Sequence, residues 1–219
     1  DTSSLLKTWD DILVRDNGNT GLWLDGPLGG LSNVVAYGNR GYGLHAAGTL
    51  NSITASEFHH NSYGGAYLYY TGATTVQSSR FHDNGYSGLS FSTSDAALVG
   101  SANLGDGLGN LAWGNSQHGF DVYGPALVAG NTAWDNAYEG FSLSGSEARG
   151  NLAHGNRRGI QVYNGSANYN RVYDNTLEGI YASYSNLDGN VAYTNATGLA
   201  LYGNRSEEHT SELQSRLHL

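Results

Sequence analysis

Short runs of alternating apolar and polar residues recur along the chain in units of about twenty residues. Each unit holds three such runs separated by Asn and Gly, as in NLAWGNSQHGFDVYG from Asn110 to Gly124. A glycine opening the pattern G-Φ-x-Φ, where Φ is apolar, marks each unit, at Gly21, Gly43, Gly65, Gly88, Gly119, Gly140, Gly159, Gly179 and Gly198. The steps between these glycines are 22, 22, 23, 31, 21, 19, 20 and 19 residues, so one unit is enlarged.

Alternation over so few residues, without a 3.6-residue apolar periodicity, predicts short strands. Three strands per unit, each stacked on the same strand of the next unit, give an all-β parallel β-helix. An Asn precedes each marker glycine, at Asn17, Asn39, Asn61, Asn84, Asn115, Asn136, Asn156, Asn175 and Asn195. We expect these Asn residues to take the left-handed backbone conformation at corners and to hydrogen-bond to their counterparts one coil away. We expect the glycines to supply positive φ.

The unit N-Φ-A-[WYH]-x-N-x-x-x-G-Φ-x-Φ resembles the right-handed parallel β-helix repeat of the pectate-lyase-like superfamily. That group includes copper-protein accessory factors, alginate epimerases, polysaccharide lyases and large bacterial surface proteins. The resemblance implies a right-handed solenoid over residues 13–204, with coils of 19–23 residues and one enlarged coil, after a partial coil at residues 1–12. It also implies a secreted or cell-surface protein that meets polysaccharide.

The composition of the chain limits the classes of partner that it could bind. A formal net charge of -9 argues against nucleic acid, whose phosphates are bound by Lys and Arg. No apolar run is long enough to predict insertion into a membrane, and the absence of Cys excludes a disulfide framework. Residues 205–219 break the repeat, and RSEEHTSELQS from Arg205 to Ser215 resembles the translation of a sequencing-library adapter. We therefore expect this tail to lie outside the fold.

An aromatic column is predicted on one outer face. The residue after each inward-pointing apolar position should face water, and eight of these nine residues are aromatic or His: Tyr37, His59, His82, Trp113, Trp134, His154, Tyr173 and Tyr193. Stacked at the strand spacing, such rings form a ribbon that could bind sugar rings. The alternative is that the rings only stack on one another, as cross-strand aromatic pairs do.

A second candidate site follows the marker glycine of the enlarged coil. If the protein is an enzyme, we expect His118 as base and Tyr123 as proton donor. Arg158 would then bind a substrate carboxylate, and Asp121 or Glu139 would orient the base. The long segment Ser94 to Asn110 is expected to wall this site, because long loops on rigid scaffolds often carry function.

Two observations weigh against catalysis and metal binding. The Asp-Pro-His tripeptide of the alginate epimerases is absent, and no cluster of carboxylates is placed to hold calcium. The pairs His59-His60 and His82-Asp83 lie one coil apart, but we interpret them as members of the exposed column and predict neither a metal nor another cofactor. The primary hypothesis is a secreted or surface solenoid that contacts a glycan, and the alternative is a lyase or C5-epimerase acting on an acidic glycan.

Overall fold

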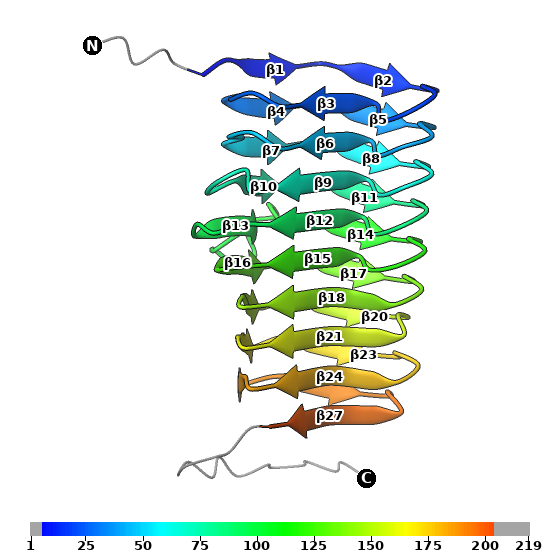
Figure 1. Ribbon diagram of the computed structural model, residues 1–219. Coiled ribbons are helices and arrows are strands. Elements are labelled where there is room, and N and C mark those ends of the chain that lie inside the picture. Colours follow the sequence, from blue (N-terminus) through cyan, green and yellow to red (C-terminus); the bar gives the residue numbers. More distant parts are fainter. Residues whose placement is uncertain (1–5, 204–219) are drawn as a thin grey trace, which may run out of the picture.

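The computed structural model describes residues 6–203, which form 27 strands and no helix (Figure 1). Three parallel sheets of nine strands each run along a solenoid of about nine turns. The predicted fold class is thereby confirmed, and Leu22 pairs in parallel with Leu44 as the repeat requires. None of the described residues forms a helix that could span a membrane. The expected tail, residues 205–219, lies outside the described residues.

Each coil contributes one strand to each sheet. Sheet A contains β1 (Thr8–Asp10), β4 (Gly30–Ser32), β7 (Ser52–Thr54), β10 (Thr75–Gln77), β13 (Ala97–Gly100), β16 (Ala126–Ala129), β19 (Glu147–Arg149), β22 (Ser166–Asn168) and β25 (Asn186–Asp188). Sheet B contains β2 (Leu13–Arg15), β5 (Val35–Tyr37), β8 (Glu57–His59), β11 (Arg80–His82), β14 (Leu111–Trp113), β17 (Thr132–Trp134), β20 (Leu152–His154), β23 (Arg171–Tyr173) and β26 (Val191–Tyr193). Sheet C contains β3 (Leu22–Leu24), β6 (Leu44–Ala46), β9 (Ala66–Tyr69), β12 (Leu89–Ser92), β15 (Phe120–Tyr123), β18 (Glu139–Ser144), β21 (Arg158–Tyr163), β24 (Glu178–Ser183) and β27 (Thr197–Tyr202).

The core is a set of apolar columns along the solenoid axis. Successive side chains of a strand point to opposite faces, so in sheet B the middle residue of each strand points inward. Phe58 and Phe81 stack with ring centroids 5.5 Å apart, and Phe120 and Phe141 stack at 5.1 Å. All four are fully buried, and burial of such rings supplies much of the hydrophobic stabilisation.

The corner between sheets B and C is held by the predicted column of Asn residues. The Asn39 side chain donates a hydrogen bond to Asn61 Oδ1 at 2.9 Å, and this contact repeats from coil to coil. The left-handed conformation, however, belongs to the residue before each Asn, such as His60 at φ 52° and Asp83 at φ 54°. That residue turns the chain, and the buried Asn that follows bonds to the neighbouring coil.

The marker glycines serve a purpose different from the one expected. None of the nine has positive φ. A Cβ at Gly65 would instead lie 2.5 Å from the carbonyl oxygen of Gly88, and one at Gly88 would lie 2.8 Å from that of Gly119. The absence of a side chain allows close approach of adjacent coils, so it is this packing that requires glycine.

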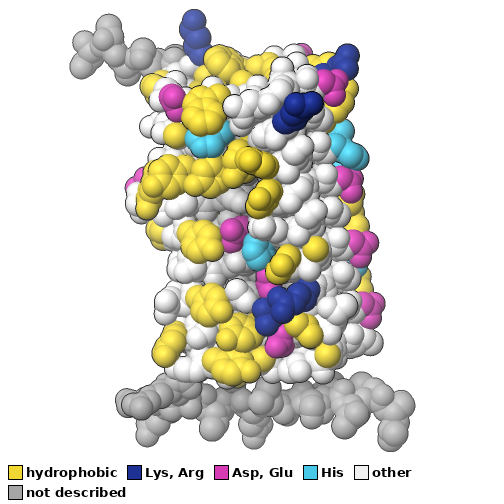
Figure 2. Space-filling view, turned by 45° about the vertical axis from the view of Figure 1, so that its right-hand side comes forward, with side chains coloured by type: hydrophobic (Ala, Val, Ile, Leu, Met, Phe, Trp, Pro, Cys, Tyr) yellow, Lys and Arg dark blue, Asp and Glu magenta, His cyan; other side chains and the backbone are white. Residues whose placement is uncertain are grey.

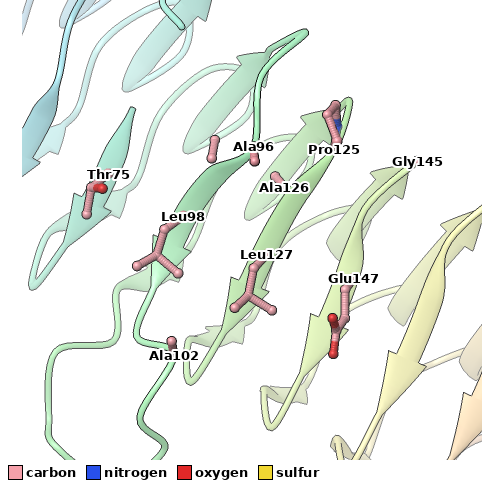
Figure 3. A pocket seen from close by; sticks show the side chains of 10 residues that line it. Thr75, Ala96, Leu98, Ala102, Pro125, Ala126, Leu127, Gly145 and Glu147 are labelled. Atoms are coloured by element: carbon pink, nitrogen blue, oxygen red, sulfur yellow. The ribbon is translucent and has the colours of Figure 1, made fainter. Parts of the chain in front are cut away.

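The enlarged coil carries its extra residues between β13 and β14, at the corner between sheets A and B. The Arg149 Nη2 group donates to Ala102 O at 3.0 Å, and Ser78 N donates to Leu108 O at 3.0 Å. Ala102 also borders an open hollow of about 470 Å³ on sheet A, into which Leu98 and Leu127 project (Figure 3). The loop therefore packs over the coils on both sides of it.

Candidate functional site

The predicted aromatic column lies on the outer face of sheet B, in one register. Neighbouring rings from Tyr37 to Tyr193 are 4.0 to 6.2 Å apart with interplanar angles of 2° to 13°. The rings therefore cover one another's faces, which was the alternative left open by the sequence. Sugar rings stack on aromatic faces, whereas the inner members of this column offer only their edges to water.

A different column, on the outer face of sheet C, alternates between Tyr and Ser. In register order it contains Tyr69, Ser92, Tyr123, Ser144, Tyr163, Ser183 and Tyr202. The tyrosines are 36% to 54% exposed, and within the described residues none stacks on the next tyrosine of this column. Because a serine separates them, the tyrosines are two strand spacings apart, about 9.5 Å. We call these seven residues the Tyr-Ser column.

A further aromatic group lies where sheet C meets the corner with sheet B. Trp23 is 57% exposed and stacks on His45 at 4.0 Å. Tyr42 stacks on Tyr67 at 5.3 Å and meets Tyr63 edge to face at 5.5 Å. Figure 2 shows hydrophobic and charged side chains gathered along this side of the molecule. Exposed aromatic groups and the Tyr-Ser column thus share one surface.

A charged network crosses the lower half of the same surface. Glu139, at the start of β18, is 3% exposed and receives contacts from two coils. His118 Nδ1 lies 2.8 Å from Glu139 Oε2, which is ion-pair distance when the imidazole is protonated. Arg158 Nη1 donates to Glu139 Oε1 at 3.0 Å, and Arg158 Nε donates to Glu178 Oε2 at 2.6 Å. These four side chains form a His-Glu-Arg-Glu chain over four coils.

The pKa values of Glu139 and Asp121 on this surface are shifted in opposite directions. Burial acts to raise the pKa of Glu139, but its contacts with His118 and Arg158 outweigh burial and hold that pKa below the usual value. Burial raises the pKa of Asp121, and the neighbouring His118 offsets this only in part. The charge of Asp121 in turn raises the pKa of the Tyr123 phenol. One carboxyl is therefore stabilised as an anion and its neighbour is not.

Comparison with known proteins decides the family. The model of a right handed beta helix region matches residues 7–177. The chain belongs to this family. A pectate lyase, Pel9A, has a similar structure, with a TM-score of 0.55 and 15% identity over 90% of this chain and 67% of that chain. At such low identity the likeness establishes the fold alone. No curated protein matches the sequence.

On this right-handed β-helix, the five residues of the predicted catalytic set lie on one surface. His118, Glu139 and Arg158 touch, while Asp121 and Tyr123 share β15. The expectation that the segment Ser94 to Asn110 walls this site is wrong. Its additional residues form a loop at the corner of sheets A and B, and the width of sheet B separates this loop from His118. The reason is that its additional residues follow β13, one sheet earlier in the coil.

Sequence reasoning missed Glu178, which completes the network. A signal was available, because the network residues each precede a marker glycine, at His118, Glu139, Arg158 and Glu178. The hydrogen bond from Arg158 to Glu178 bears on the role expected of Arg158. Its guanidinium is bonded to two carboxylates, so its charge is already neutralised within the protein. Arg157 also lies 4.0 Å from Glu139.

Proposed function

We propose that this right-handed β-helix binds a neutral polysaccharide lengthwise along the outer face of sheet C. The observation that carries the proposal is the Tyr-Ser column, in which exposed tyrosines recur every second coil. At a spacing of about 9.5 Å, successive tyrosines of the column would each contact a different sugar ring of an extended chain. Sugar rings would stack on the tyrosines, and the half-buried hydroxyls of Ser92 and Ser144 would bond to sugar hydroxyls.

The charges favour a neutral ligand over an acidic one. Along the charged network, Arg157 and Arg158 each have a carboxylate oxygen within 4.0 Å. A uronate would have to displace Glu139 or Glu178 from Arg158 in order to be recognised. The net charge of -9 adds long-range repulsion of a polyanion.

The family supports the class of ligand and the setting. The similar solved structure is that of a pectate lyase, an enzyme named for a polysaccharide substrate. A long polysaccharide is a partner met outside the cell or at its surface, so we place the protein there. The edge-on rings of the sheet B column lead us to place the glycan on sheet C instead.

Affinity electrophoresis tests the proposal with neutral glycans, such as mannan, xyloglucan and mixed-linkage glucan, beside pectate and alginate. We expect Tyr123→Ala and Tyr163→Ala to weaken retention on a neutral gel by about two- to tenfold each. Tyr173→Ala, in the sheet B column, is the matched control and should leave retention unchanged. Retention that responds only to Tyr173→Ala would move the site to sheet B, and the absence of retention on any neutral gel would refute the proposal.

The second candidate is a lyase or epimerase acting on an acidic glycan. It is favoured by the raised pKa of Asp121 beside His118, since perturbed acids cluster at catalytic sites. Unsaturated uronate absorbance reports a lyase on pectate, alginate and glycosaminoglycans, and proton exchange at C5 reports an epimerase. Activity that His118→Ala abolishes would support this candidate over simple binding.

A further inference from the structure

Three histidines converge where β8 and β11 end, on a part of the surface that the proposed glycan site does not use. His59 ends β8, His60 forms the adjoining corner, and His82 ends β11 one coil away. One nitrogen of each ring lies within 4.8 Å of the other two. His60 is exposed, so solutes have access to the cluster.

His59 and His60 form the closest pair of the cluster. The Nδ1 atoms of His59 and His60 are 2.8 Å apart, and the two rings are nearly perpendicular, at 85°. At this separation only one of the two nitrogens can carry a proton between them, so the other presents a lone pair.

The third histidine is oriented by carboxylates. His82 Nε2 lies 2.9 Å from Glu57 Oε1, and His82 Nδ1 lies 2.7 Å from Asp83 Oδ2. Whichever ring nitrogen of His82 binds an ion, the other keeps a carboxylate partner. Metal-ligating histidines are commonly held in this way by a carboxylate on the second nitrogen.

We propose that His59, His60 and His82 bind a divalent transition-metal ion of the Zn²⁺, Ni²⁺ or Cu²⁺ class. Tetrahedral zinc at about 2.0–2.1 Å from each ligand holds nitrogens about 3.3 Å apart. The His59–His60 pair therefore opens slightly, and His82 tilts out of its stack toward them. Glu57 and Asp83 supply negative charge beside the ion, and imidazole ligands suit this class of metal.

The position of the cluster within the sheet B column provides a control. His154 occupies the same column, stacked on Tyr173 at 5.0 Å, but it is followed by Gly155 and not by a second histidine. Three ligands converge only around His60 in the part of the chain that the structure describes. His154→Gln is therefore a matched variant that removes a column histidine without touching the proposed ligands.

The movement of His82 also provides a signal. Its ring lies 4.0 Å from Trp113, nearly parallel at 5°. Tilting of His82, or quenching by Cu²⁺ or Ni²⁺, should change the fluorescence of Trp113. Trp113→Phe should remove this signal while metal binding measured by heat persists.

The experiment titrates the full chain, free of any affinity tag, with ZnCl₂ by calorimetry and with NiCl₂ by fluorescence. We expect one ion per chain, a loss of affinity of at least about a hundredfold in His60→Asn, and a loss of about ten- to a hundredfold in Asp83→Asn. Asn tolerates the positive φ of these two corners, and circular dichroism checks that both variants fold. His154→Gln should bind like the parent.

Two outcomes would overturn the proposal. One is the absence of saturable Zn²⁺ or Ni²⁺ binding by the folded parent chain. The other is binding that His60→Asn leaves intact or that His154→Gln weakens equally, because scattered surface histidines would then account for it. Visible absorption of the Co²⁺-loaded chain, with the intense bands of a four-coordinate site, would support the assigned geometry.

Discussion

Replacement of Asn115 by Ala tests whether the buried Asn column stabilises the solenoid. Asn115 is 1% exposed and lies at the corner between β14 and β15. Its side chain donates to Phe81 O at 3.0 Å and to Asn136 Oδ1 at 2.8 Å. Its Oδ1 accepts from the backbone and side-chain nitrogens of Asn84, at 3.2 and 3.0 Å. Asn115→Ala removes all four hydrogen bonds.

The expected loss of unfolding free energy follows from these bonds. A buried hydrogen bond contributes about 1 kcal/mol net, so four give about 4 kcal/mol. The backbone N–H of Asn84 loses its acceptor in a buried setting, whereas Phe81 O keeps its place in the β11–β14 ladder and Asn136 Oδ1 still accepts from Asn115 N at 3.2 Å. We therefore expect Asn115→Ala to cost about 3–5 kcal/mol.

Urea denaturation followed by far-UV circular dichroism measures this cost, provided that the variants share one m-value. Asn17→Ala is the matched control, because Asn17 is the exposed first member of the column and its side chain makes one bond, to Asn39 Oδ1 at 2.8 Å. Hydrogen exchange at the Asn84 amide should speed up only in Asn115→Ala. A cost within about 1 kcal/mol of the control, with unchanged exchange, would refute the reasoning.

Three further predictions concern coil packing and the dependence of stability on pH. Gly119→Ala would place a Cβ 2.7 Å from Gly140 O and should lower the free energy of unfolding by about 1–3 kcal/mol. Gly18→Ala is the control, because its Cβ meets no atom within 4 Å and should leave stability unchanged. Equal melting temperatures of the two variants would contradict this prediction. The pKa of Glu139 in the folded protein lies below its usual 4.5. The ionised Glu139 carboxylate therefore stabilises the fold above pH 4.5, and this stabilisation is lost as the pH falls through the folded pKa. Glu139→Gln should lack this loss of stability at low pH. The pKa of Asp121 is raised above 3.8, so Asp121→Asn should instead raise melting temperatures near neutral pH, and the two variants shifting alike there would contradict the assignment.

The fold was predictable because a β-solenoid repeats one local rule. The position of Ala36 in its unit already indicated an inward residue, and Tyr37 an outward one, as alternation along a strand requires. The conformations at the corners were less predictable. The sequence suggested positive φ at Asn61, yet His60 adopts it, because the side chain of Asn61 must point inward to bond to Asn84.

The sequence predicted which residues of the candidate site share a surface, but it did not predict which of their side chains contact one another. Periodicity placed Asp121 and Tyr123 on one strand and His118 at the turn before it. It did not reveal that Glu178 shares Arg158 with Glu139, since that depends on how long side chains extend between coils. The two carboxylate partners of Arg158 therefore had to be found from the structure, although the surface that carries the residue followed from the repeat.

The sequence by itself determined the number of coils, the columns, and which residue types each column holds. It did so because strand alternation and a constant coil length fix every residue's column before any contact is known. Only the tertiary structure decided what the columns present. Trp113 and Trp134 cover each other's faces, whereas Ser144 lies between Tyr123 and Tyr163 and keeps these two rings from stacking on each other. Side-chain rotamers and contacts between coils govern this difference, and these depend on neighbours about twenty residues away in sequence.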